Sequence, residues 1–170
     1  MKFLLLFSLL FTSFSFQAQE SLEKLLQKHN TKSVPYISVQ ELAMPKTEAI
    51  ILDAREIDEY NTSHLKDALF VGYDHFNLAE TTKNLKNKEQ QIVVYCSLGI
   101  RSEDIAEKLQ AAGYKNVLNL YGGIFEWKNN NFPIYNLEEK ETEDVHTFSK
   151  AWSKWLLKGN RIFKEEKEDE

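Results

Sequence analysis

The sequence predicts an α/β fold, in which strands and helices alternate along the chain. Two short apolar runs, residues 49–52 and 92–95, have the composition of buried strands. A helical pattern follows the second run, because Ile105 and Leu109 recur at helical spacing before Gly113, a residue typical of helix ends. Strand, short loop and helix in this order favour an α/β sheet, which binds its ligands at the carboxyl ends of its strands.

Local patterns predict the other elements in turn. A helix is expected over residues 21–30, where Leu22, Leu25 and Leu26 share one face. Two consecutive glycines, Gly122 and Gly123, predict a turn that starts a late helix. Short strands are expected at 36–39, 68–72 and 117–120, and short helices at 39–44, 82–85 and 124–128.

Composition limits the classes of function. The chain has 170 residues, of which 42% are hydrophobic and 28% are charged, so one globular domain with short extensions is expected. A formal net charge of −5 argues against nucleic acid or an anionic membrane surface as the main partner. No group of His, Cys or carboxylate residues has metal-ligand spacing, so we expect no metal site, and no cofactor is required.

Residues 1–18 have the features of a secretory signal peptide. Lys2 is followed by a nearly uninterrupted apolar run, residues 3–11, which is too short to span a bilayer. We therefore expect a mature protein that is periplasmic or secreted, with no stable membrane span after cleavage. Cys96 is the only cysteine of the chain, so it cannot form an internal disulfide and is a candidate reactive group.

The loop between the predicted strand 92–95 and the following helix carries the candidate chemistry. It consists of Cys96, Ser97, Leu98, Gly99, Ile100 and Arg101. Loop amides and the start of a helix stabilise an anion such as a thiolate, and Arg101 adds a permanent positive charge. A cysteine at the end of a strand is otherwise often a small buried apolar residue, but Gly99 and Arg101 at this spacing favour a nucleophile.

Three motifs in this chain resemble those of the rhodanese family. They are LDAREIDEY at 52–60, CSLGIRS at 96–102 and YGGIFEW at 121–127, within a similarity that runs from 37 to 135. The resemblance implies a five-stranded, mostly parallel sheet flanked by helices, and Cys96 as a catalytic nucleophile that carries a transferable sulfur as a persulfide. The substrate-binding residues would be Ser97, Leu98, Gly99, Ile100, Arg101 and Ser102. A loop of six residues from Cys to Arg resembles the sulfur-transferring members, whereas related phosphatases and arsenate reductases have one residue more.

Three further residues are expected to support the site. Asp53 and Arg55 belong to a segment that looks like the family's D-x-R-E motif, and Arg55 is expected to pair with a carboxylate and orient the loops. Direct contact of this cluster with a sulfur donor is the alternative. His64 stands where the family has a histidine, and we expect a hydrogen-bonded structural group rather than a base.

The chain end is predicted to be an extension of the domain. Five acidic residues between 137 and 144 favour a solvated linker, and Phe148, Trp152, Trp155 and Leu156 have the spacing of an amphipathic helix. This helix either packs on the domain or offers Trp152 and Trp155 to a protein partner or a membrane surface. The predicted organisation is therefore a signal peptide (1–18), an N-terminal helical extension (19–36), a rhodanese-like domain (37–135), an acidic linker with an amphipathic helix (136–163) and a charged disordered tail (164–170).

The predicted function is that of an exported sulfurtransferase. Cys96 would take sulfur from a small donor such as thiosulfate, or from a protein persulfide, and pass it to a thiol or to cyanide. The alternatives are a non-catalytic module that binds a persulfide, an anion or a protein, and, less favoured because of loop length, a phosphatase or arsenate reductase. Glu103 and Asp104 are expected to repel a doubly charged donor. Leu98 and Ile100 would favour an apolar or protein-borne persulfide if their side chains face the mouth of the site.

Overall fold

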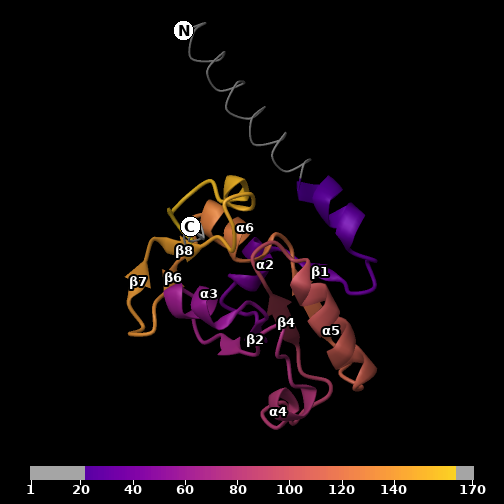
Figure 1. Ribbon diagram of the computed structural model, residues 1–170. Helices are drawn as coiled ribbons and strands as arrows, with labels where there is room; N and C mark the ends of the chain where they lie inside the picture. The colour runs from indigo at the N-terminus through magenta and orange to yellow at the C-terminus, as the bar shows by residue number, and fades with distance from the viewer. Residues whose placement is uncertain (1–21, 164–170) are drawn as a thin grey trace, which may run out of the picture.

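A five-stranded parallel sheet forms the centre of the protein (Figure 1). The computed structural model describes residues 22–163. The strands of the sheet are β1 (Tyr36–Ile37), β2 (Ile50–Asp53), β3 (Leu69–Phe70), β4 (Ile92–Tyr95) and β5 (Val117–Leu120). They lie in the order β1-β5-β4-β2-β3, and every neighbouring pair is parallel. This arrangement confirms the predicted fold class and places β4, with the candidate loop at its end, in the middle.

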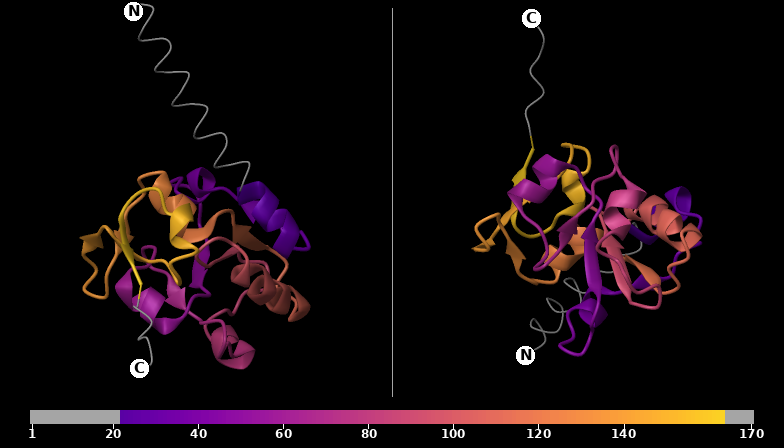
Figure 2. Two further views of the ribbon diagram at one scale, coloured as in Figure 1. Left: turned by 45° about the horizontal axis from the view of Figure 1, so that its top comes forward. Right: turned by 90° about the horizontal axis from the view of Figure 1, so that it is seen from below.

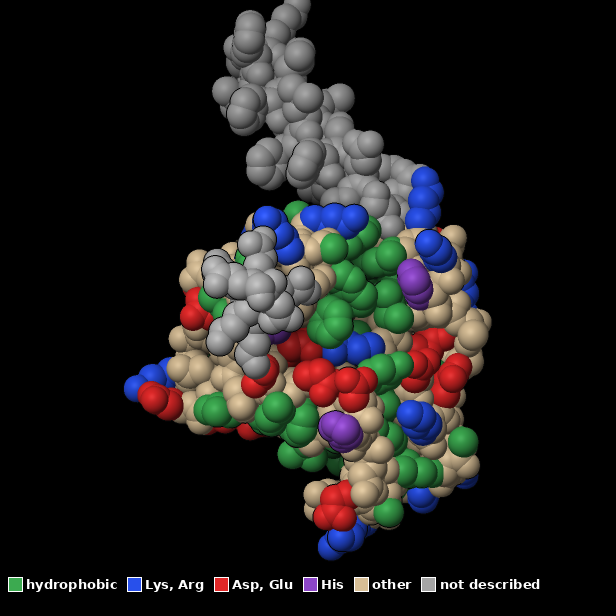
Figure 3. All heavy atoms as spheres, viewed as in Figure 1, with side chains coloured by type: hydrophobic (Ala, Val, Ile, Leu, Met, Phe, Trp, Pro, Cys, Tyr) green, Lys and Arg blue, Asp and Glu red, His purple; other side chains and the backbone are tan. Residues whose placement is uncertain are grey.

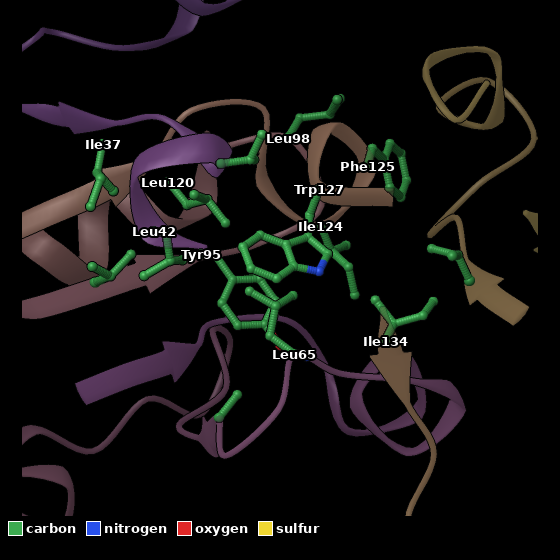
Figure 4. Packing of buried hydrophobic residues seen from close by; sticks show 14 of the residues in the cluster. Ile37, Leu42, Leu65, Tyr95, Leu98, Leu120, Ile124, Phe125, Trp127 and Ile134 are labelled. Carbon is green, nitrogen blue, oxygen red and sulfur yellow. The ribbon is translucent and has the colours of Figure 1, made fainter. Parts of the chain in front are cut away.

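Helices cover both faces of the sheet (Figure 2). They are residues 22–29, α2 (Val39–Leu42), α3 (Ile57–Thr62), α4 (Leu78–Thr82), α5 (Arg101–Ala111) and α6 (Gly123–Asn129). Successive side chains of β4 point to opposite faces, so Val93 and Tyr95 join one buried cluster, and Ile92 and Val94 join another. The first cluster, called the main cluster below, packs against α6 (Figure 4), where Trp127 is only 9% exposed. The second cluster packs against α5.

The C-terminal region differs from the prediction of a linker followed by a helix. It contains the strands β6 (Ile134–Tyr135), β7 (Glu141–Thr142), β8 (Asp144–His146) and β9 (Asn160–Ile162), and one short 3-10 helix, η1 (Ser153–Trp155). Strand β6 pairs with β7 in an antiparallel hairpin, and β8 pairs with β9 in parallel. The predicted acidic linker and amphipathic helix were therefore wrong.

Two physical features explain this difference. The acidic segment is anchored because Glu143 pairs with the buried Lys128 at 2.7 Å and Val145 is fully buried. Phe148 has a positive φ of 62°, which a right-handed helix cannot accommodate. The apolar spacing of residues 148–156 instead reflects side chains that meet the main cluster from turns, with Leu156 buried and Trp152 and Trp155 partly buried.

Some predictions concern parts of the chain outside this description. The signal peptide (1–18) and the charged tail (164–170) lie outside the described residues. Within residues 22–163, no helix is both long and apolar enough to cross a membrane.

Candidate active site

Cys96 directly follows the central strand β4, and its side chain lies inside the loop. Cys96 and Ser97 are fully buried. The backbone N–H of Gly99 donates a hydrogen bond to Sγ of Cys96 at 3.1 Å, and the hydroxyl of Ser102 lies 3.5 Å from the same sulfur. The sulfur therefore faces one loop amide and the first turn of α5, two groups that can stabilise negative charge on it.

The start of α6 holds the loop from behind. The backbone N–H groups of Ile124 and Phe125 donate to the carbonyl oxygens of Cys96 and Ser97 at 2.9 and 3.2 Å. Gly123 makes this approach possible, since a Cβ at that position would lie 2.7 Å from the carbonyl carbon of Ser97 and closer still to the carbonyl oxygen of Cys96. The paired glycines of the YGGIFEW motif therefore allow α6 to contact the Cys96 loop directly.

Two asparagines fix the orientation of Gly99. The carbonyl oxygen of Gly99 accepts hydrogen bonds from Nδ2 of Asn119 at 2.9 Å and from Nδ2 of Asn30 at 2.8 Å. Oδ1 of Asn119 accepts a hydrogen bond from the hydroxyl of Ser102 at 2.8 Å. Sequence reasoning assigned no role to either asparagine. The available signal was Asn119 itself, because an asparagine inside an apolar strand needs a buried polar partner.

Arg101 closes the loop, but it is already paired with a carboxylate. Its Nη1 and Nη2 atoms each lie 2.8 Å from an oxygen of Glu59 in α3, and Ser97 donates its hydroxyl to the same carboxylate at 2.8 Å. Burial would lower the pKa of Arg101, but hydrogen bonds and charge from Glu59 raise that pKa above its usual value. Burial would likewise raise the pKa of Glu59, and Arg101 lowers it below its usual value. Both groups are therefore charged at neutral pH.

Asp53 and Arg55 form a buried scaffold beside the loop. Nη2 of Arg55 pairs with the carboxylate of Asp53 at 2.6 Å and also donates to the carbonyl oxygen of Ser63. Tyr95, opposite Asp53 in the sheet, donates its hydroxyl to the same carboxylate at 2.5 Å. Burial and the charge of Asp53 raise the pKa of Tyr95, so this hydroxyl stays protonated. Arg55 is fully buried, which fits the expected structural role rather than contact with a donor.

His64 occupies a similarly structural position. Its ring stacks on Tyr60 with centroids 4.3 Å apart, and its Nδ1 lies 3.2 Å from the carbonyl oxygen of Tyr60. Its backbone exchanges hydrogen bonds with Tyr135 of β6. These contacts tie the turn before β3 to the C-terminal hairpin, and none of them reaches Cys96.

Leu98 and Glu103 do not lie at the mouth of the site, because both side chains are buried. Leu98 is 1% exposed and belongs to the main hydrophobic cluster (Figure 4), whereas Ile100 is partly buried against that cluster. Glu103 is 3% exposed, and one of its carboxylate oxygens accepts backbone N–H groups of Thr31 and Lys32 at 2.7 and 3.0 Å. The loop after the first helix needs an acceptor for these amides, so Glu103 faces that loop rather than the donor.

Comparison with known proteins gives this site a family. The model of the rhodanese-like domain matches residues 38–130, which is more than half of the chain. The chain belongs to the rhodanese-like family. A thiosulfate sulfurtransferase, GlpE of Coxiella burnetii (strain RSA 493 / Nine Mile phase I), is 32% identical over 99 residues, which are 57% of this chain and 87% of that protein. Putative sulfur carrier protein YrkF of Bacillus subtilis (strain 168) is 34% identical over 103 residues, covering 58% of this chain and 53% of that protein.

A solved structure supports the same fold. The crystal structure of a Bacillus halodurans protein has a TM-score of 0.55 and 23% sequence identity, covering 67% of this chain and 85% of that one. At this identity the likeness concerns the fold alone. The rhodanese-like match ends at residue 130, so β6 to β9 and the turns between them lie beyond it.

The site of this rhodanese-like chain has one nucleophile, which accepts hydrogen bonds from neutral donors, and two buried ion pairs beside it, Glu59–Arg101 and Asp53–Arg55. The nucleophile is Cys96, with the amide of Gly99 and the hydroxyl of Ser102 as donors. The described part of the chain has no group of three or more His, Cys, Asp or Glu side chains placed to hold a metal ion. The geometry can stabilise a sulfur anion at the end of β4.

Proposed function

We propose that this protein is a sulfurtransferase that works through a persulfide on Cys96. The Cys96 thiolate attacks the outer sulfur of a donor, the donor's S–S bond breaks, and its electron pair leaves with sulfite, a sulfinate or a thiolate. An acceptor thiolate or cyanide then attacks the terminal sulfur of the persulfide and releases the Cys96 thiolate. The observation that carries this proposal is the position of Sγ, 3.1 Å from the Gly99 amide and 3.5 Å from the Ser102 hydroxyl.

The family supports the reaction class. Relatives named as a thiosulfate sulfurtransferase and as a putative sulfur carrier protein share the region that contains the Cys96 loop. No other cysteine of the chain can take part, because Cys96 is the only one. Nucleophile and persulfide carrier are therefore the same atom.

Intact mass spectrometry tests this proposal directly. Incubation with a sulfane donor should add about 32 Da per sulfur to the protein, and a reductant should remove it. The Cys96→Ser variant should stay folded, gain no mass and transfer no sulfur to cyanide. Transfer at the wild-type rate by the serine variant would overturn the assignment of Cys96.

The relative named as a putative sulfur carrier protein favours a second candidate function. A carrier holds one sulfur on Cys96 for a protein partner, which would dock near Trp152 and Trp155, rather than turning over small donors. Steady-state transfer separates the two cases, because a carrier forms the persulfide once without multiple turnovers. Hydrolysis of an artificial phosphoester tests the phosphatase alternative, and we expect none.

We also propose, from residues 1–18 alone, that the protein is exported. The supporting features are Lys2 and the apolar run over residues 3–11. In a bacterial host, mature protein recovered from the periplasm or the medium should begin between Phe16 and Glu20. An exported protein that still carries Met1 would contradict signal cleavage.

A further inference from the structure

Phe148 covers the guanidinium of the Cys96 loop. The guanidinium carbon of Arg101 lies 4.9 Å from the centroid of the Phe148 ring, and that ring is tilted against Trp152 with centroids 5.5 Å apart. Phe148 lies beyond the rhodanese-like match, which ends at residue 130. The C-terminal segment therefore supplies an aromatic side chain to a site that the rest of the domain builds.

The segment on both sides of Phe148 is firmly attached to the domain. Thr147 is fully buried and its backbone N–H donates to the carbonyl oxygen of Ile162 at 2.7 Å. Leu156 is buried in the main cluster, and Asn129 of α6 accepts the backbone N–H of Leu157 at 2.7 Å. Phe148 lies between these anchors and is 48% exposed. The anchors fix the place of this segment, and the Phe148 ring keeps one side exposed to solvent.

Phe148 has a backbone conformation that is unfavourable for its residue type. Its φ of 62° lies in the left-handed region, which large side chains seldom adopt. The hydrogen bond from the Phe148 N–H to Nδ1 of His146 at 3.2 Å accompanies this turn. The turn directs an aromatic ring to Arg101 at a position where glycine would be the least strained residue.

The charges around Arg101 also disfavour an anion. Glu59 neutralises the guanidinium through two hydrogen bonds. Asp104, in the first turn of α5, accepts the hydroxyl of Tyr73 at 2.6 Å. It lies three positions after Arg101, so it adds a negative charge on the same side of the helix. Figure 3 shows that hydrophobic, basic and acidic side chains lie close together near the centre of the face it draws. A dianion that approaches Arg101 would meet a covered cation with an acidic neighbour.

We infer that Phe148 is a specificity-determining residue, which covers Arg101 and favours a sulfane donor with an apolar carrier over inorganic thiosulfate. This inference rests on the proposed sulfur transfer. The donors it favours are organic persulfides and aromatic thiosulfonates, because their carrier group can contact the Phe148 ring. Thiosulfate has only charge to offer, and the one cation of the loop is paired with Glu59 and stacked under the ring.

Two donors that differ in their carrier test this inference. In Phe148→Ala, the KM for thiosulfate should fall and the KM for benzenethiosulfonate should rise, each about two- to fivefold, the size of one exposed cation–π or aromatic contact. Phe148→Gly should shift both KM values in the same directions without backbone strain at this position. It is the second variant in case Phe148→Ala does not fold. Leu157→Ala is the matched control, because Leu157 is an equally exposed apolar residue on the same segment, and it should change neither KM. Equal shifts of both KM values would overturn the specificity role.

A second measurement does not depend on sulfur transfer. Iodoacetate and iodoacetamide alkylate a thiolate by the same chemistry but differ in charge. The rate constant of iodoacetate divided by that of iodoacetamide, both measured on Cys96, should increase about two- to fivefold in Phe148→Ala and stay constant in Leu157→Ala. An unchanged ratio in both Phe148 variants would overturn the inference. A changed ratio in a protein that forms no persulfide with any donor would contradict the proposed function and leave the role of Phe148 in charge selection standing.

Discussion

Glu59 accepts two hydrogen bonds from Arg101, each 2.8 Å long, and thereby joins helix α3 to the loop that holds Cys96. The same carboxylate also accepts the hydroxyl of Ser97 and the backbone N–H of Glu56. All lone pairs of Glu59 are thus directed at donors, while its side chain is 1% exposed. The pair positions the loop and removes the free positive charge that the sequence motif suggests.

Glu59→Gln should destabilise the protein strongly. The substitution leaves the charge of Arg101 buried without its counterion, which costs about 3–5 kcal/mol of unfolding free energy. Urea denaturation measures this loss. The control is Glu80→Gln, which breaks the exposed pair with Lys83 and should cost no more than about 0.5 kcal/mol. Equal losses of unfolding free energy in both variants would show that the buried pair stabilises the protein no more than the exposed pair does.

The sequence predicted the sheet and the loop well for a physical reason. Residues 92–95 are fully buried on both faces, so their apolar run has one plausible structure, and the loop after them follows from strand order. Glu59 lies in the LDAREIDEY motif, but its pairing with Arg101 was not predicted, because contacts between α3 and α5 depend on tertiary structure. Asn30 was missed for the same reason, since its partner Gly99 is 69 positions away.

The prediction for the C-terminal region was wrong because the same apolar pattern is compatible with two different structures. Phe148, Trp152 and Leu156 recur at helical spacing, but turns bring Trp152 and Leu156 to the main cluster, while Phe148 stays exposed and contacts Trp152. The deciding facts are the left-handed backbone of Phe148 and the pairing of β8 with β9, which joins residues 16 positions apart. Neither is encoded in hydrophobic spacing.

Gly123→Ala should distort the Cys96 loop. The new Cβ would overlap the carbonyl groups of Cys96 and Ser97, so we expect a loss of more than about 3 kcal/mol in unfolding free energy and slower persulfide formation. Gly113→Ala is the matched control, because Gly113 also has a positive φ but has nothing within 4 Å of its added Cβ. It should lose only about 1 kcal/mol and keep full activity. Equal effects of the two variants would contradict the role given to α6.

Asn119→Ala tests a positioning residue rather than a catalytic one. The substitution leaves the Gly99 carbonyl with Asn30 as its remaining partner and frees the Ser102 hydroxyl. We expect kcat to fall about tenfold with a small change in KM, because a single buried hydrogen bond to a poised group is worth about 1–2 kcal/mol. Asn130→Ala, which breaks contacts with Glu126 within α6 and its C-cap, is the control and should retain kcat. A purely structural Asn119 would lower the unfolding free energy without this split between kcat and KM.

The stability difference between wild type and Glu59→Gln should depend on pH in one direction. Hydrogen bonds from Arg101 lower the pKa of Glu59 in the folded protein despite its burial, whereas in the unfolded chain that pKa is about 4.3. The unfolded state therefore binds a proton at a higher pH than the folded state, so acid weakens the wild type relative to the variant. The difference in unfolding free energy should be constant between about pH 6 and 7 and should shrink as the pH falls below about 4.3. Urea denaturation of both proteins from pH 7 to pH 3 measures it, and the titration of every other group cancels in the comparison to first order. A difference that stays constant or grows towards pH 3 would show that Arg101 does not lower the pKa of Glu59 in the folded protein.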